Sequence, residues 1–194
     1  MPSIVLASSS PFRQALLKKL GLNFQCHSPD IDETALPGES AQALVQRLSL
    51  EKAKAVADTF PNALIIGSDQ VAINPDGEIL GKPGTEEKAV AQLKKASGAT
   101  VEFATGLCLL NSATGKAQVD YESFKVHFRE LSEAVIRRYV AAEQPLNSAG
   151  SFKSEGLGIV LFHAMEGRDP NSLVGLPLIM LTDFLANEGI TLPL

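Results

Sequence analysis

The sequence predicts a mixed α/β fold, and three observations support this prediction. An unbroken apolar run at residues 63–66 is typical of a strand buried on both faces. A short apolar strand pattern at 4–7 leads through three serines into a helical pattern at 12–20. Two long strand patterns, at 100–111 and 117–129, are joined by a short turn sequence and indicate a long twisted hairpin.

The central strand is expected to deliver a carboxylate to a site. Gly67 follows the apolar run, and the missing side chain lets another backbone or a ligand approach closely. We expect the strand to end there, so that Ser68, Asp69 and Gln70 are polar groups at a strand end. Ligands in α/β proteins usually bind at such strand ends. Ordinary turn residues are the alternative interpretation of Asp69 and Gln70.

Composition limits the class of protein. The chain has 194 residues, 45% of them hydrophobic, which predicts one domain with a substantial core. A net charge of −5 without a basic run argues against nucleic acid as a partner. No apolar stretch is long enough for a membrane span, and no signal peptide is recognisable. Cys26 and Cys108 are therefore expected to be reduced core thiols of a cytoplasmic protein.

The first strand and helix predict an anion site. Ser10 is a favourable N-cap and Pro11 a favourable first helical residue, after the serines Ser8 and Ser9. A helix N-terminus of this kind offers backbone N–H groups and the positive end of the dipole. Arg13 in the first turn opposes the dipole, which is reasonable if an anion binds there. A solvated surface arginine is the alternative.

The next segment combines acidic and basic groups. A short strand is expected at 24–28, then an acidic loop at 29–38, then a helix from Ser40 to about Phe60. The loop carboxylates could hold a hard metal ion, although such loops are more often solvated. By its pattern alone, Lys52 is an exposed helix lysine.

A hairpin is expected after the central strand. Pro75-Asp76-Gly77 lies between the apolar runs 71–73 and 78–80, which is a strong turn signal. The return strand leads to Lys82, which lies between residues that restrict the backbone. A lysine presented in this way suits neutralisation of a phosphate. Thr85 is expected to cap a helix that ends at Gly98.

The sequence predicts a helix, a loop, a strand and two further helices in the last third of the chain. Ser132 should cap a helix to about Gln144, and a long polar loop at 145–158 has the composition of a functional loop. A strand is expected at 159–162. Asp169-Pro170 should start a short helix, and Pro177 a final one that ends at Gly189.

Seven polar segments, in order along almost the whole chain, resemble those of the Maf/YceF family of nucleoside triphosphate pyrophosphatases. The segments are Ser8 to Arg13, Asp32-Glu33-Thr34, Glu51-Lys52-Ala53, Gly67 to Val71, Gly81-Lys82-Pro83, Ser148 to Phe152 and Asp169 to Pro177. The resemblance implies one ITPase-like domain over residues 1–194, with an elongated, mixed, twisted sheet, flanking helices and a cleft between two lobes. It also implies a cytoplasmic hydrolase that cleaves a nucleotide between the α and β phosphates, often as a homodimer.

The resemblance also implies roles for individual residues. Asp69 matches the proposed proton acceptor, and Glu33 could hold a metal together with Asp69. The groups expected to bind phosphate are Ser8, Ser9, Arg13, Lys52 and Lys82. Because the sequence shows no His/Cys metal cluster, a hard Mg²⁺- or Mn²⁺-like ion is favoured. Whether Asp69 is the base, a metal ligand or both is left open by the sequence.

The nucleotide base is predicted from three residues. Methylation at N7 makes guanine cationic, and an aromatic face such as Phe12 attracts a cation. Glu155 could accept hydrogen bonds from N1–H and the 2-amino group of guanine. Gln70 could add an amide contact. The segment Gly150 to Gly156 resembles the branch of the family that acts on 7-methyl-GTP, and Phe12 and Glu155 favour the same branch. The alternatives are that Phe12 is a core residue and that Glu155 is a solvated residue.

Three other functions are weighed against this hypothesis. A dTTP/UTP pyrophosphatase of the same fold is disfavoured by Glu155, because uracil and thymine carbonyls would repel its carboxylate. A non-catalytic nucleotide-binding regulator of septum formation is disfavoured because the expected charged residues are all present. A nucleic-acid-binding module is disfavoured by the acidic charge balance. The expected partner is a small-molecule nucleotide, without nucleic acid or membrane.

Overall fold

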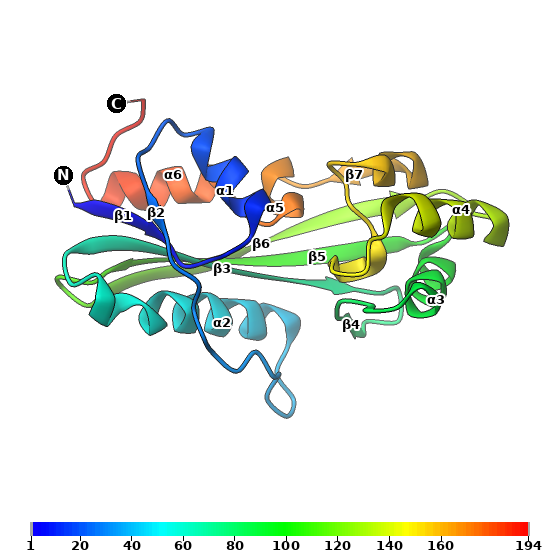
Figure 1. The fold of residues 1–194 in the computed structure, drawn as a ribbon, viewed down its shortest axis with the longest axis horizontal. Helices are drawn as coiled ribbons and strands as arrows, with labels where there is room; N and C mark the ends of the chain where they lie inside the picture. Colours follow the sequence, from blue (N-terminus) through cyan, green and yellow to red (C-terminus); the bar gives the residue numbers. More distant parts are fainter. Residues whose placement is uncertain (1, 194) are drawn as a thin grey trace. The chain divides into compact units, whose positions relative to one another are not determined.

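The computed structural model describes residues 2–193, and its strands form one seven-stranded mixed sheet (Figure 1). The strand order is β2-β1-β3-β5-β6-β7, with β4 paired to β3. β1 is parallel to β2 and to β3, whereas β4 is antiparallel to β3 and β7 to β6. The predicted mixed α/β fold is confirmed.

The elements have the following bounds. The strands are β1 Ser3–Leu6, β2 Gln25–Cys26, β3 Ala63–Ile73, β4 Ile79–Leu80, β5 Thr100–Asn111, β6 Lys116–Phe128 and β7 Phe162–Glu166. The helices are α1 Pro11–Lys18, α2 Ala41–Ala55, α3 Glu86–Ala96, α4 Glu133–Glu143, α5 Pro170–Val174 and α6 Leu178–Asn187. Short 3₁₀ helices are η1 Ala57–Thr59, η2 Ala149–Ser151 and η3 Leu157–Leu161.

The chain divides into two compact units. Unit 1 comprises Met1–Asp69, Thr105–Glu122 and Asn171–Leu194, and unit 2 comprises Gln70–Ala104 and Ser123–Pro170. Strands β3, β5 and β6 each contribute residues to both units. The division into units does not show whether they fold separately, because β3, β5 and β6 run through both. The single domain over residues 1–194 therefore stays a prediction.

Unit 1 has helices on both faces of its part of the sheet. Figure 1 shows α2 on one side of the strands and α1 with α6 on the other. Successive side chains of β3 point to opposite faces of the sheet, as strand geometry requires. Ile65 packs in a buried cluster with Ala53 of α2, whereas Ile66 packs with Leu17 of α1 and Leu181 of α6. The strand is therefore buried on both faces, as its sequence predicted.

Helix α2 lies unusually close to the sheet because two glycines face it. A Cβ added at Gly67 would clash with the backbone carbonyl of Ser49 and would lie 3.1 Å from the backbone N of Ala53. A Cβ added at Gly106 would similarly clash with the carbonyl group of Val45. The close approach expected at Gly67 is confirmed. The expected strand end at Gly67 is wrong, because β3 continues to Ile73.

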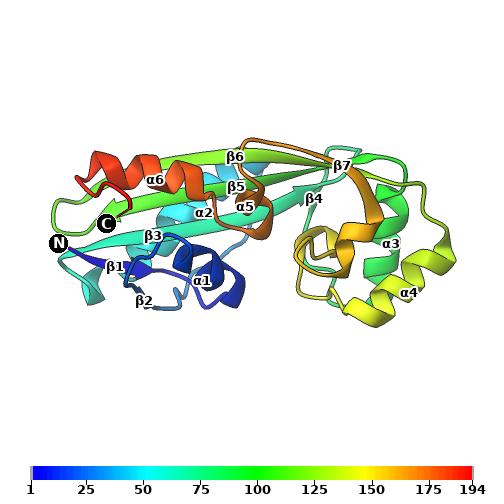
Figure 2. The same ribbon diagram turned by 90° about the horizontal axis from the view of Figure 1, so that it is seen from above.

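Unit 2 is organised around aromatic rings and two packed helices. Phe103, Phe128, Phe152 and Phe162 form edge-to-face pairs with centroids 5.3–6.2 Å apart. Helices α3 and α4 pack against each other (Figure 2). The hairpin expected from Pro75-Asp76-Gly77 is confirmed by the pairing of β3 with β4.

The strand expected at 159–162 is wrong. Residues 157–161 form the 3₁₀ helix η3, and β7 begins only at Phe162. The backbone N–H groups of Gly156 and Gly158 both donate to the carbonyl of Lys153, which bends this segment into a compact turn. An added Cβ at Gly158 would clash with the Lys153 backbone, so the turn depends on glycine at this position.

The predicted N-caps are confirmed, whereas the predicted C-terminal end of α2 is wrong. Each expected N-cap, Ser10, Ser40, Thr85 and Ser132, accepts a hydrogen bond from a backbone N–H in the first turn of its helix. Helix α2 ends at Ala55 instead of near residue 60, where η1 takes over. Between residues 2 and 193, no helix has the length and apolar character needed to cross a bilayer.

One cysteine prediction is wrong. Cys26 is exposed, because the two-residue strand β2 is exposed along its length, whereas Cys108 on β5 is buried as expected. Burial raises the pKa of the Cys108 thiol to about 12.

Candidate active site

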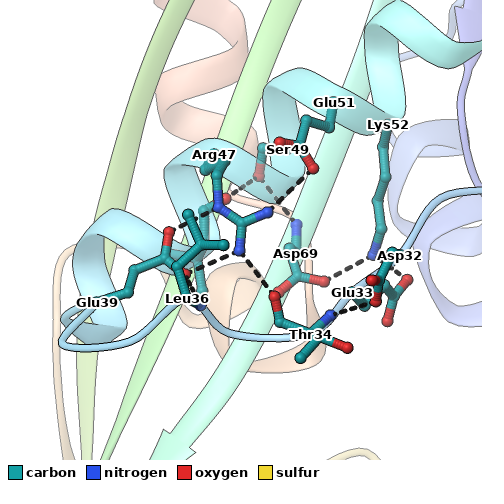
Figure 3. Close-up of polar contacts among 11 residues, drawn as sticks. Asp32, Glu33, Thr34, Leu36, Glu39, Arg47, Ser49, Glu51, Lys52 and Asp69 are labelled. Atoms are coloured by element: carbon teal, nitrogen blue, oxygen red, sulfur yellow. Dashed lines mark hydrogen bonds and ion pairs between the residues drawn. The ribbon is translucent and has the colours of Figure 1, made fainter.

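The best-defined polar cluster of unit 1 lies between α2, β3 and the acidic loop. The ammonium of Lys52 donates to Oδ1 of Asp69 at 2.6 Å and lies 2.8 Å from Oε1 of Glu33 (Figure 3). Lys52 and Asp69 are only 6% and 7% exposed. The residue pattern had indicated an exposed lysine, and that interpretation is wrong, because its Nζ reaches the buried carboxylate on β3. Glu33, with a side chain 57% exposed, forms the outer edge of the cluster.

Ser49 connects Asp69 to α2 by a hydrogen bond. The backbone N–H of Asp69 donates to Oγ of Ser49 at 3.1 Å, and this hydroxyl donates to the carbonyl of Val45 at 2.6 Å. Gly67 of β3 and Gly106 of β5, which have no side chains, allow this close contact between helix and sheet. Because both its backbone and its carboxylate are held, Asp69 has little freedom to change position. Sequence reasoning missed Ser49, although a serine among the apolar positions of α2 was a signal that could have found it.

The start of α1 places Arg13 and the serines as predicted at a helix N-terminus. Oγ of Ser8 accepts from the N–H of Ser10 at 3.1 Å, and Oγ of Ser10 accepts from the N–H of Arg13 at 3.4 Å. Ser8 is buried and Ser9 is exposed. Burial lowers the pKa of the Arg13 guanidinium, and the nearby carboxylates of Asp69 and Glu33 act in the opposite direction. Arg13 therefore belongs to the same electrostatic environment as the lysine-carboxylate cluster.

Gly175 fixes the side chain of Arg13. Nε of Arg13 donates to the carbonyl of Gly175 at 2.8 Å, and Oγ of Ser68 lies 3.1 Å from the same oxygen. Gly175 has a φ of 126°, a backbone conformation that residues other than glycine rarely adopt. This glycine lies in the segment Asp169 to Pro177, one of the seven segments that carry the family resemblance, for which the sequence indicated no role. Its carbonyl is a positioning group that sequence reasoning missed.

Three of the predicted site residues lie in unit 2, whereas Phe12 lies in unit 1. Lys82 is exposed in the loop after β4, Glu155 is exposed in the loop before η3, and Gln70 lies within β3. Gln92 of α3 connects the two loops: its Nε2 donates to the carbonyl of Gly81 at 3.3 Å, and its Oε1 accepts from the hydroxyl of Ser151. The loops that carry Lys82 and Glu155 are thus held to one helix.

Comparisons with known proteins identify the family. Residues 3–188 match the family model described as Maf-like protein. The chain belongs to the Maf family. It is 64% identical over 193 residues to a protein of Alcanivorax borkumensis, covering 100% of this chain and 98% of that protein. Proteins of Pseudomonas aeruginosa and Pseudomonas syringae pv. tomato are each 58% identical over 193 residues and covered in full. All three relatives are named 7-methyl-GTP pyrophosphatase.

Membership of the Maf family raises the question of whether the cluster can hold a divalent metal. Glu33 and Asp69 each place one carboxylate oxygen against the same ammonium nitrogen, at 2.8 and 2.6 Å, so both oxygens already face one cation. Within residues 2–193, no three His, Cys, Asp or Glu side chains form a metal-ligand group. Mg²⁺ commonly binds through one or two carboxylates, with water and substrate phosphate completing its shell. The two oxygen donors fit a hard divalent cation of this type.

The residues predicted from the family motifs in unit 1 can now be compared with their observed positions. Glu33, Lys52 and Asp69 are in direct contact, and the carboxylates of Asp69 and Glu33 act electrostatically on Arg13. Phe12 is 42% exposed, so the alternative of a core residue is wrong.

Proposed function

We propose that this protein hydrolyses 7-methyl-GTP to 7-methyl-GMP and diphosphate. The activity is supported by three full-length relatives of this name at 58–64% identity. The observation that carries the chemistry is the buried contact of Lys52 with Asp69, beside Glu33. Such a cluster provides a cation for phosphate and a carboxylate for water at one place.

The proposed phosphate-binding groups include cations that are already paired with carboxylates. Arg13 and Lys52 are balanced by Asp69 and Glu33, so these four groups together offer little net positive charge to a triphosphate. We assign phosphate binding to Ser8, Ser9, Arg13, Lys52 and Lys82. The serines lie at the N-terminus of α1, where N–H groups and the helix dipole favour anions.

A divalent cation would supply the missing positive charge. Glu33 and Asp69 are the residues that would hold Mg²⁺ or Mn²⁺. When bound, such a cation stabilises negative charge on phosphate and lowers the pKa of a bound water.

Asp69 is assigned as the proton acceptor. Water attacks the α-phosphorus, the bond to the oxygen that bridges the α and β phosphates breaks, and diphosphate leaves. The water proton passes to a carboxylate oxygen of Asp69. Since Lys52 donates to Asp69 at 2.6 Å, a substrate phosphate would compete with Asp69 for the ammonium. Capture of the ammonium by phosphate frees the carboxylate for the proton.

Base selection is assigned to Phe12, Gln70 and Glu155. The exposed ring of Phe12, the second residue of α1, lies close in sequence to the serines Ser8 to Ser10 and can stack on the cationic methylated guanine. The exposed carboxylate of Glu155 can accept from two adjacent guanine donors. We further propose that the protein acts in the cytoplasm on a small-molecule nucleotide, as a homodimer and without nucleic-acid or membrane partners.

The test is pyrophosphate release from 7-methyl-GTP, GTP, dTTP, UTP, ITP and ATP with Mg²⁺ or Mn²⁺. We expect 7-methyl-GTP to be the preferred substrate, and Asp69→Asn to abolish turnover of it while the variant still folds. We expect Glu155→Gln to reduce the preference for 7-methyl-GTP over UTP. Preference for UTP or dTTP would refute the roles of Phe12 and Glu155, and binding without turnover of any nucleotide would refute the enzyme in favour of a regulator.

A further inference from the structure

Arg47 of α2 contacts Thr34 of the acidic loop, Glu39 directly after this loop, and Glu51 of its own helix. Its Nε and Nη2 donate to the two carboxylate oxygens of Glu39 at 2.7 and 2.8 Å. Nη1 donates to Glu51 at 3.1 Å, and Nη2 also donates to the carbonyl of Thr34 at 3.1 Å (Figure 3). Two-pronged contacts between arginine and carboxylate fix geometry as well as contributing energy.

These contacts determine the shape of the loop that carries Glu33. Oε2 of Glu39 accepts from the N–H of Leu36 at 2.9 Å, and Arg47 holds the carbonyl of Thr34. Oδ1 of Asp32 accepts from the N–H of Thr34 at 2.9 Å, which closes a tight turn around Glu33. The loop has no helix or strand of its own between β2 and α2. Its conformation next to Glu33 therefore depends on side chains, with Arg47 at their centre.

The exposed ion pair of Glu33 cannot by itself position this loop. The Glu33 side chain is 57% exposed, and exposed ion pairs contribute little, because solvent screens them and side-chain entropy opposes them. The partner of Arg47 is better shielded, since the Glu39 side chain is only 8% exposed. The guanidinium of Arg47 lowers the pKa of Glu39 to about 2.

We propose that Arg47 is a positioning residue that holds Glu33 in place for metal binding beside Asp69. The inference rests on the proposed function only in taking Glu33 and Asp69 as the cation ligands. Arg47 acts on Glu33 through the backbone of Thr34, the next residue in the chain, whose carbonyl accepts from Nη2 of Arg47 (Figure 3).

The test measures Mn²⁺ affinity by electron paramagnetic resonance of the free ion, without nucleotide. Arg47→Met should weaken Mn²⁺ binding by roughly 10-fold, since loss of groups that orient metal ligands typically costs 10- to 100-fold. Arg47→Lys keeps the charge but not the two-pronged contact, and it should recover only part of the affinity. The matched control is Arg137→Met, which removes an arginine of α4 that is paired with Glu87 of α3 and Glu133 of α4, and it should leave Mn²⁺ affinity unchanged.

A double-mutant cycle separates positioning from general loss of structure. In a Glu33→Gln background, Arg47→Met should have almost no further effect on Mn²⁺ affinity, because the ligand that it positions is gone. An equal loss in both backgrounds, or no loss in the wild-type background, would overturn the proposal. Because the measurement uses Mn²⁺ alone, failure to hydrolyse 7-methyl-GTP would refute the proposed function and leave this result standing.

Discussion

Replacing Gly67 by alanine tests whether close packing of α2 on β3 builds the active site. The added methyl group would clash with the carbonyl oxygen of Ser49 and would lie 3.1 Å from both the carbonyl carbon of Ser49 and the N of Ala53. All three atoms belong to the backbone of α2, so no side-chain rotation can relieve the overlap. The helix must move away from the strand or the strand must bend.

The size of the effect follows from this geometry. Overpacking of a tight interior typically costs about 1–3 kcal/mol. Movement of α2 also separates Lys52 and Ser49 from Asp69, which they contact at 2.6 and 3.1 Å. Because a misplacement of about 1 Å can cost about 100-fold in rate, we expect Gly67→Ala to lose about that factor in kcat while the protein stays folded.

The assay combines urea unfolding with pyrophosphate release from 7-methyl-GTP. Ile66→Val is the matched control, because Ile66 is the fully buried neighbour on the opposite face of β3. It should cost about 0.5–1.5 kcal/mol of stability with nearly unchanged kcat. Equal kcat in Gly67→Ala and in the wild type would refute the argument that helix-strand spacing sets the catalytic geometry.

Three further predictions concern ionisable groups. Lys52→Met should bind Mn²⁺ more tightly, measured by electron paramagnetic resonance, because the ammonium occupies the volume between the two carboxylates; weaker binding would contradict this. The pKa of Glu39 is lowered from its ordinary value of 4.5 to about 2 by Arg47, so its contribution to stability is complete above pH 4.5 and is lost toward pH 2. The melting temperature of Glu39→Gln should therefore fall below that of the wild type at pH 7 and converge with it over this range. A thiol reagent should label Cys26 alone in the native protein and both Cys26 and Cys108 in denaturant; labelling of two native thiols would contradict the burial of Cys108.

The features that could be predicted from sequence are those with local physical causes. Ser40 caps α2 because its side chain accepts a backbone hydrogen bond three residues later, and this depends on nearby residues alone. The turn at Pro75-Asp76-Gly77 likewise joins β3 to β4 through backbone preferences of its own residues. Gly67 was predicted to allow a close approach because it interrupts an apolar run, although which backbone approaches could not be known.

The features that could not be predicted depend on contacts distant in sequence. Lys52 looks like a surface lysine until β3 places Asp69 beside it, 17 residues away. Arg47 likewise resembles a solvated helix residue until the acidic loop folds back to it. Cys26 lies in a strand-like stretch, but the residues of the two-residue strand β2 are exposed.

The continuation of β3 beyond Gly67 changes how its polar residues can act. If the strand had ended there, Asp69 and Gln70 could both have turned toward one site. Within a strand, consecutive side chains project to opposite faces. Asp69 contacts Lys52 on the α2 face, and Ser68 contacts Gly175 on the other face. Any contact of Gln70 with substrate must therefore start from the face opposite to Asp69, so its proposed role in base selection is independent of proton transfer at Asp69.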